Sequence, residues 1–461
     1  MIAAYCRACG FWPGDRLVLS AGLIGGQDAV LLRSIGERFP GTRVLSLRYH
    51  CYGQGKELAL ALFTLACRAL RIQPGRRVLD VPVPMIADSL RGEGESRAMP
   101  VLERALARLL ERIGDRLVHC DVSFLDEFRA RVRDWVLPQI DEFYGIAKAQ
   151  GHLLGHVQPD LMIAPSGSHV HQSLATLCGQ RGISALLIPM KALVPPGSNV
   201  EGMGIGQIGI ELVTEDFPYV AAQSPLTAGY LEWSGYGGQR IETGPLIWSR
   251  LTDADREEQR QRFFERMGGP GAILVYAPSN KWMAPFHVAQ TRDEVLSTAA
   301  DLAEMVADWR NLYLVLRLHP APSLTIADVE TLVDLPRNAV VDTGNRVSFA
   351  GVLALADALV TDTSTAAEEA IQNGIPVLLY DRWARYNHLK APAVTADHPD
   401  ALSPAYYVTA RETLASTLEW ILENHPVGTD VPEGLKRRFV YAEGHREAFY
   451  QFVGQALGWM R

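Results

Sequence analysis

The sequence has no long apolar run and no leader pattern at its beginning. Its most apolar helical stretch, Leu58 to Cys67, spans ten residues, whereas a membrane-spanning helix needs about 20. The opening residues, MIAAYCRACGFWPGDR, lack a basic segment followed by a long apolar one, which is the pattern of a secretory signal peptide. These absences predict a cytoplasmic protein.

Cysteine is scarce, and the six cysteines all lie within the first 178 residues at irregular intervals. Cys6 and Cys9 form a CxxC pair, but no second pair completes a zinc set, and no βαβ pattern surrounds them as it does in thioredoxins. We therefore expect reduced thiols in a protein core, with no disulfide framework and no metal site.

Positive charge is in deficit. The chain carries 44 Lys and Arg against 52 Asp and Glu, a net charge of −8. This balance argues against non-specific nucleic-acid binding, so no nucleic acid is expected as a partner. A chain of 461 residues is long for one hydrophobic core, and two domains are expected.

Short β-rich runs alternate with amphipathic helical stretches, which is the pattern of a parallel sheet with crossover helices. The longest helices of the first half are expected over Ala98–Ile113 and Ser123–Ala149. The strands expected in the first half are Arg16–Ser20, Arg43–Leu47, Arg77–Val81, Asp160–Ala164, Ala185–Pro189 and Tyr219–Ala222.

A charged segment, SRLTDADREEQRQRFFERMGGPG (249–271), resembles a linker helix and loop, and the alternation begins again after it. The strands expected in the second half are Ala272–Tyr276, Leu312–Leu318, Ala339–Asp342, Ala358–Thr361 and Val377–Tyr380. This restart predicts an α/β fold with two Rossmann-like, doubly wound parallel-sheet domains facing a cleft. The bounds that we expect are 1–250 for the N-terminal domain, 251–270 for the linker, 271–435 for the C-terminal domain and 436–461 for a C-terminal helix that returns to the first domain.

Ligands of open α/β sheets bind beyond the carboxyl ends of the strands, so the residues after each strand are candidates for a site. Ser279 and Lys281 follow Ala272–Tyr276 in the segment APSNKWM, where a small polar loop with one cation can contact a phosphate. The alternative is an ordinary surface loop.

The strand LYLVLRL ends at His319 and Pro320. Because proline fixes the turn, the imidazole is expected at the carboxyl end of the strand, where it can donate to a phosphate or act as an acid or base. A structural histidine is the alternative. Arg317, two residues earlier in the strand, should point to the same face as His319.

The segment TDTSTAAEEA (361–370) runs from a strand end into a helix. Thr363, Ser364 and Thr365 supply hydroxyls, and the first turn of the helix presents N–H groups, so together they can bind an anion. One of Glu368 and Glu369 can close a capping box with Ser364 or Thr365, and the other can accept hydrogen bonds from ribose. A well-capped crossover helix without a ligand is the alternative.

The order and spacing of these motifs resemble the nucleotide-binding half of the GT-B glycosyltransferases, especially those that build bacterial capsule, lipopolysaccharide or teichoic-acid polymers. Sialyl- and Kdo-transferase-like groups carry an HP motif and a Ser/Thr-rich motif of this kind, and CDP-glycerol polymerases are similar here. The passages HVQPDLMIAPSGSHVHQSLATLCGQRGISALLIP, EDFPYVAAQSPLTAGYLEWSGYGGQRIETGPLIWSRL and GHREAFYQFVGQAL also resemble segments of such enzymes. The resemblance covers roughly 155–461.

The resemblance implies a glycosyltransferase that moves a sugar from a nucleotide-activated donor to a glycan or lipid-linked acceptor in surface polysaccharide synthesis. It implies neither a metal nor a cofactor, and it is compatible with peripheral association with the inner membrane or an assembly complex. By the same resemblance His319 would contact the donor phosphate, Thr363–Thr365 would hold the phosphate or nucleotide, and Glu368 or Glu369 would hold the ribose. This chain departs from many relatives in having Met190-Lys191 where they have His-Gly, and it lacks a D/E-D/E-G motif.

An inverting enzyme also needs a base for the acceptor hydroxyl, normally from the first domain. The candidates are Asp28, in the glycine-rich segment SAGLIGGQDAV, and His169 or His171, in PSGSHVHQS, with helix-cap roles as the alternatives. His169 and His171 are two residues apart on an early helix turn, so at most one of them can reach the substrate. A retaining enzyme would need neither as a base.

Two other functions fit the pattern. A UDP-N-acetylglucosamine epimerase of the same fold has a segment similar to TDTSTAAEEA, but such enzymes open with a GTRPE-like strand end where this chain has SAGL at 20–23. A non-catalytic nucleotide-sugar-binding subunit of a polysaccharide assembly complex is the other alternative.

Overall fold

The protein divides into two compact units. The structure, a computed structural model, describes residues 16–21, 26–48, 78–82, 98–113, 118–119, 122–189, 194–199, 201–202, 213–248, 250–279, 290–318, 324–343, 348–394, 402–442 and 444–459. Unit 1 takes the described residues within Met1–Ile188, Val213–Val220 and Tyr450–Arg461, and unit 2 those within Pro189–Leu212 and Ala221–Phe449.

A seven-stranded sheet has the order β3-β2-β1-β6-β7-β8-β9, and its pairs from β3 to β8 are parallel. The strand order reverses direction between β1 and β6, which makes this pair the switch point of the sheet. The bounds are β1 (Leu17–Ala21), β2 (Arg43–Arg48), β3 (Val78–Pro82), β6 (Leu161–Ala164), β7 (Ser184–Leu187), β8 (Tyr219–Ala222) and β9 (Gln239–Glu242), and a separate antiparallel pair consists of β4 (Val118–His119) and β5 (Val122–Ser123).

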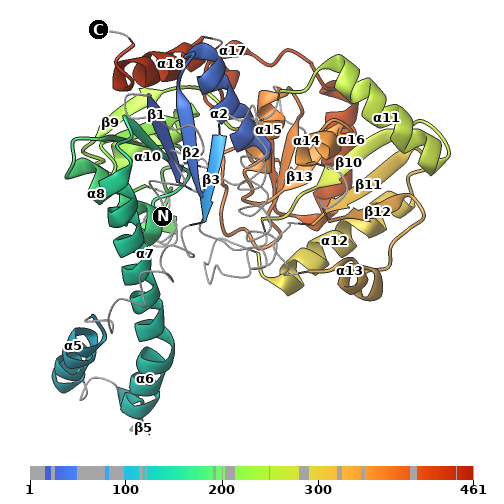
Figure 1. Ribbon diagram of the computed structural model, residues 1–461. Helices are drawn as coiled ribbons and strands as arrows, with labels where there is room; N and C mark the ends of the chain where they lie inside the picture. The colour runs from blue at the N-terminus through green and yellow to red at the C-terminus, as the bar shows by residue number, and fades with distance from the viewer. Residues whose placement is uncertain are drawn as a thin grey trace, which may run out of the picture. The chain divides into compact units, whose positions relative to one another are not determined.

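The helix expected over Ser123–Ala149 forms as three consecutive segments, with a π-helical turn between α6 and α7. Figure 1 shows α6 and α7 one after the other. Pro138 follows this turn and has no N–H to donate to the preceding turn, which accounts for the local change of helix type. The helices of this half are α2 (Gly26–Arg38), α5 (Ala98–Ile113), α6 (Leu125–Arg131), the π-helix η2 (Val132–Val136), α7 (Leu137–His156), α8 (His169–Gly179) and α10 (Pro225–Trp233).

A six-stranded, fully parallel sheet has the order β12-β11-β10-β13-β14-β15, so its switch point lies between β10 and β13. The strands are β10 (Ala272–Tyr276), β11 (Leu312–Arg317), β12 (Ala339–Asp342), β13 (Ala358–Thr361), β14 (Val377–Tyr380) and β15 (Ala405–Val408).

Both faces of this second sheet are buried under helices, as Figure 1 shows for β10, β11 and β13. Along β10, Leu274 and Tyr276 pack on one face and Ile273 and Val275 on the other, because successive side chains of a strand alternate. The helices are α11 (Asp253–Met267), α12 (Arg292–Ala307), α13 (Ile326–Leu332), α14 (Phe349–Leu353), α15 (Ala366–Gln372), α16 (Leu414–Asn424) and α17 (Glu433–Lys436), with a 3-10 turn η3 (Arg411–Thr413).

The C-terminal helix α18 (His445–Ala456) contacts elements of the first half of the chain, as expected from the sequence. The Phe452 and Tyr219 rings lie 4.7 Å apart, and the Arg38 guanidinium lies 5.8 Å from the centre of the Tyr450 ring. Helix α11, which overlaps the expected linker, lies in unit 2, where Phe263 is buried against the second sheet.

The expected fold class, an α/β fold with two Rossmann-like parallel sheets, is confirmed. Every strand expected from the sequence is present within two residues of its expected bounds, and the helix over Ala98–Ile113 has the expected ends. Strands β9, β15, β4 and β5 were not expected. None of the described helices is long and apolar enough to cross a membrane.

The backbone at Gly271, just before β10, has no room for a side chain. A Cβ there would lie 2.7 Å from the Asn311 carbonyl oxygen and 2.8 Å from Tyr313 Cε2. We predict that Gly271→Ala lowers the free energy of unfolding by about 1–3 kcal/mol, measured by urea denaturation. Gly237→Ala is the control, because a Cβ at Gly237 meets nothing within 4 Å. Equal stability of the two variants would contradict the prediction.

Candidate functional site

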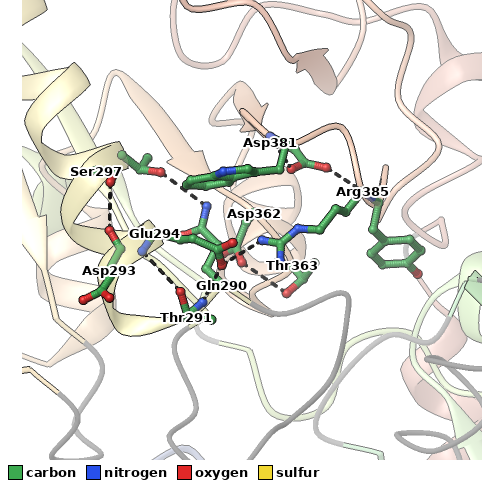
Figure 2. Close-up of polar contacts among 12 residues, drawn as sticks. Gln290, Thr291, Asp293, Glu294, Ser297, Asp362, Thr363, Asp381 and Arg385 are labelled. Carbon is green, nitrogen blue, oxygen red and sulfur yellow. Dashed lines mark hydrogen bonds and ion pairs between the residues drawn. The ribbon is translucent and has the colours of Figure 1, made fainter.

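Polar side chains meet at the switch point of the second sheet. Ser279 follows β10, and Asp362 and Thr363 follow β13. The Ser279 amide donates to Asp362 Oδ1 at 2.9 Å, its hydroxyl donates to Asp362 Oδ2 at 2.5 Å, and the same hydroxyl lies 2.7 Å from Thr363 Oγ1. All three residues are buried, and Figure 2 shows Asp362 and Thr363 side by side. The two strand-end loops are therefore fastened together at the place where such sheets bind ligands.

Strand β13 is also hydrogen-bonded to the residue that follows β10, just before this cluster in the chain. The Thr361 hydroxyl donates to the Ala277 carbonyl oxygen at 2.6 Å, and the Ala277 amide donates to the Val360 carbonyl oxygen at 3.0 Å. Burial raises the pKa of Tyr276 well above its usual value, and the charge of Asp362 raises it further. The Tyr276 hydroxyl therefore stays protonated and donates to Gln290 Oε1 at 3.0 Å.

The start of α15 is built differently from the expectation. Thr365 is the N-cap residue, but its backbone is helical, with φ −58° and ψ −15°, and its side chain caps nothing. The Ser364 hydroxyl instead accepts from the Ala366 amide at 3.2 Å. The expected capping box with Glu368 or Glu369 is therefore wrong, because an N-cap side chain reaches back to the helix when its own backbone is extended.

Glu368 and Glu369 lie inside α15, and both are buried. Glu368 Oε1 lies 3.6 Å from Nε2 of His388, whose side chain is 2% exposed. A buried carboxylate beside a buried imidazole is an arrangement that clusters at functional sites. The sequence alone does not single out His388, because nothing in the local pattern shows that it lies beside Glu368 of α15.

The loop after β14 is held by the Asp381 carboxylate. Asp381 Oδ2 accepts from the Tyr386 amide at 2.8 Å and from the Tyr407 hydroxyl at 3.1 Å. Ala384 and Lys390, both in this loop, have φ near +50°, a conformation that side-chain-bearing residues rarely adopt. Such backbone strain concentrates at ligand-binding loops.

Arg385 in the same loop reaches the first turn of α12. Its Nη2 donates to Glu294 Oε2 at 2.9 Å (Figure 2). The guanidinium lies 5.4 Å from the centre of the Trp383 ring. Burial opposes ionisation of Glu294, but hydrogen bonds from Thr291 and Arg385 outweigh it and lower the pKa of the carboxyl. Glu294 therefore stays charged and ties the loop to the helix.

A second ion pair fastens the other end of this loop. Lys390 Nζ donates to Glu201 Oε2 at 2.7 Å, and the Gly197 amide donates to the same oxygen at 2.5 Å. Lys390 Nζ also lies 5.3 Å from the centre of the Tyr386 ring. The pKa of Tyr386 is raised by burial first and then by the charges of Glu201 and Glu368. The loop thus carries a partly buried cluster of ionisable groups.

Four expected donor-binding residues remain, of which the structure describes only Arg317. Arg317 is buried and forms an ion pair with Asp342, its register partner on β12. Lys281, His319 and Pro320 lie outside the described residues. Their expected roles stay predictions.

The candidate bases lie in the first half of the chain. Asp28 falls in α2, but its side chain is outside what the structure describes. His169 is exposed at the start of α8, with its ring 5.8 Å from the Phe143 ring in an edge-on contact. His171 is buried and lies against Ser166 and Ser168.

Within the described ranges, no group of three or more His, Cys, Asp or Glu side chains is arranged to hold a metal ion. The sequence matches no protein-family model, and no curated protein is significantly similar to it.

Solved structures share the fold. The UDP-GlcNAc 2-epimerase from Neisseria meningitidis bound to UDP-GlcNAc has a TM-score of 0.51 at 10% identity, over 96% of this chain and 98% of that chain. The UDP-GlcNAc 2-epimerase from Methanocaldococcus jannaschii has a TM-score of 0.51 at 9% identity, over 95% and 99% of the two chains. The wall teichoic acid polymerase TagF is also similar, with a TM-score of 0.49 at 10% identity over 99% and 93%.

The two likenesses with a TM-score above 0.5 establish the fold alone. The chain has the GT-B fold, with two Rossmann-like domains. At about 10% identity the activity of no neighbour carries over to this chain.

The Asp362 carboxylate is the centre of the cluster that it forms with Ser279 and Thr363. Its contribution to stability can be tested by substitution. We predict that Asp362→Asn lowers the free energy of unfolding by about 1–3 kcal/mol, because it replaces two charge-assisted hydrogen bonds from Ser279 by weaker ones. Urea denaturation measures the change, with the exposed Asp334→Asn as the control. A loss no larger than that of the control would show that the cluster does not hold the two loops.

Proposed function

We propose that this chain is a glycosyltransferase that takes a sugar from a nucleotide-activated donor and transfers it to a glycan or lipid-linked acceptor. The observation that carries the proposal is the cluster of Ser279, Asp362 and Thr363 at the switch point of the second sheet. In doubly wound sheets this position binds nucleotides. The likeness to UDP-GlcNAc 2-epimerases shows only that the fold is one that can host such a site.

The geometry supports a role for Ser364 and Thr365 in holding the donor phosphates. Thr361 and Thr363 are buried and bonded within the protein, whereas Ser364 and Thr365 are only half-buried. Their hydroxyls lie next to loops that are fixed in place by Asp362. Preorganised donors of this kind stabilise the charge that develops on a leaving nucleoside diphosphate.

The two glutamates of α15 support a ribose subsite. A carboxylate accepts hydrogen bonds from the two hydroxyls of ribose, and Glu368 and Glu369 lie in the turns that follow Ser364 and Thr365. Nε2 of His388 lies 3.6 Å from Glu368 Oε1, so this imidazole would limit the positions that the carboxylate can take. We propose that one of the two glutamates binds ribose.

The finer proposal is a role in the synthesis of a bacterial surface polysaccharide such as capsule, lipopolysaccharide or teichoic acid. It rests on the order of the sequence motifs, from the HP motif through TDTSTAAEEA to the closing helix. On this proposal the enzyme works without a metal or cofactor, in the cytoplasm or at the inner membrane surface.

Two alternative functions, an epimerase and a non-catalytic subunit, can be distinguished from a transferase by experiment. An epimerase would convert its nucleotide sugar to the epimer in the absence of any acceptor, whereas a transferase would leave the sugar unchanged or release it to the acceptor. A non-catalytic subunit would bind the nucleotide sugar and turn over nothing. Product analysis of the nucleotide sugar with and without a glycan acceptor separates the three.

Nucleotide binding is the first prediction of this proposal. We expect one of CMP, CDP, UDP, GDP and dTDP to raise the melting temperature in a concentration-dependent way, because a ligand that binds only the native state stabilises it. Ser364→Ala should weaken that binding about tenfold, since it removes one hydrogen bond to a charged group. Ser416→Ala, an exposed serine of α16, is the matched control. No response to any of the five nucleotides would refute the proposal.

His319 provides a second prediction. We expect His319→Ala to weaken nucleotide binding or turnover by at least tenfold while leaving the melting temperature of the free protein unchanged, because the lost contact is to the donor phosphate. The exposed His156→Ala is the control. Near-normal transfer by His319→Ala would remove this residue from the mechanism.

A further inference from the structure

Helix α5 has two apolar rows, and only one of them is packed. The packed row consists of Leu102, Leu106 and Leu110, of which Leu110 is buried and the other two are half-buried, and the helix contacts α7. The second row consists of Val101, Ala105 and Leu109, which are all exposed. Members of each row are four residues apart and therefore lie on one face of the helix.

The exposed row has the geometry of a second packing face. It is shifted by one residue from the packed row, which is about 100° around an α-helix. Val101 is 54% exposed and Leu109 is 44% exposed, although both side chains are large and apolar. A helix with two apolar faces about a quarter turn apart has two neighbours, as in a four-helix bundle. Unit 1 supplies one of these neighbours, which is α7.

A row of arginines runs beside the exposed apolar row. Arg104, Arg108 and Arg112 are all exposed, and each follows a member of the apolar row by three residues, which makes them neighbours on the helix surface. Within the part of the chain that the structure describes, none of the three forms an ion pair. The two glutamates of the helix, Glu103 and Glu111, lie outside both rows. Together with the exposed apolar row, the arginines form the α5 surface.

The segment from η2 into α7 exposes aromatic side chains beside acidic ones. Trp135 is 68% exposed and Phe143 is 37% exposed. Asp134 and Glu142 directly precede them, are exposed as well, and form no ion pair with any described residue. One wide π-helical turn and one α-helical turn together contain about eight residues, so the two acidic–aromatic pairs face the same side. These four residues form the η2–α7 surface.

The two surfaces match in charge and in spacing. Arg104 and Arg112 are eight residues apart, which is about 12 Å along an α-helix, and Asp134 and Glu142 are also eight residues apart. On each surface the charged row runs beside an apolar or aromatic one. Complementary charges of this kind select a partner and fix its register. Within one chain α5 already packs through its other row, so a second chain has to supply the match.

A membrane of anionic lipids would suit only half of this region. Arginines beside an apolar row can bind such lipids, but Asp134 and Glu142 beside the aromatic side chains would be repelled by them. A second copy of the chain satisfies both halves at once. A two-fold axis places each surface on the other and so forms the same contact twice.

We propose that the chain forms a two-fold symmetric dimer in which the α5 surface of each copy docks on the η2–α7 surface of the other. The exposed apolar row of α5 packs against the aromatic side chains, and the arginines pair with the carboxylates. The contact involves unit 1 alone. It does not depend on the proposed glycosyltransferase function, and it can fail or hold independently of that function.

Charge reversal in the intact chain tests the contact. Light scattering over a concentration series should show a dimer for the wild type. The pair Arg104→Glu and Arg112→Glu, and separately the pair Asp134→Arg and Glu142→Arg, should each raise the dimer Kd at least about a hundredfold, because like charges then meet at both contacts. Arg310→Glu, an exposed reversal in unit 2, should leave the Kd unchanged within about threefold. A monomeric wild type would overturn the proposal.

Mixing the two doubly reversed variants separates a lost contact from a lost fold. In the mixed dimer opposite charges meet again at both contacts, so dimers should return with a Kd within about tenfold of the wild type. Failure of the mixture to dimerise would overturn the proposal. A monomeric wild type that binds vesicles of anionic lipid, and loses that binding when Arg104 and Arg112 are changed to Glu, would overturn it as well and assign the α5 surface to a membrane.

Discussion

The carboxylate of Asp362 is the contact on which the rest of the candidate donor site depends. It accepts two hydrogen bonds from Ser279 and thereby fixes the loop after β10 to the loop after β13. With those loops fixed, Ser364 and Thr365 have defined positions at the start of α15, and Glu368 is directed toward His388. A buried charge of this kind is stable only because its hydrogen bonds are satisfied, so the site and the local fold depend on the same interaction.

Most of the sheet architecture could be predicted because parallel strands that are buried on both faces are short, continuous apolar runs between polar turns. Strands such as Ala272–Tyr276 and Ala358–Thr361 have that composition and were placed with their observed ends. Strand β9 was missed because its sequence, QRIE, is mostly charged and polar, and its first two residues are exposed. β9 is a strand because it pairs with β8 in the sheet, and the local sequence does not show that pairing.

The candidate site could be predicted in its residue types but not in its contacts. The polar strand ends after β10 and β13 were recognised because connectivity brings carboxyl ends of parallel strands to one edge. The pairing of Glu368 with His388, and of Glu201 with Lys390, joins residues far apart in the chain and depends on packing. His169 is exposed and His171 is buried and lies against Ser166 and Ser168, a difference that the short segment holding both of them does not show.

The central claim is that a nucleotide binds at the switch point of the second sheet. Hydrogen–deuterium exchange, measured with and without the nucleotide that stabilises the protein most, tests it directly. The account predicts slower exchange in peptides that cover 277–279 and 361–372, where the polar loops and the start of α15 lie. Protection confined to unit 1, with unchanged exchange over 361–372, would contradict it.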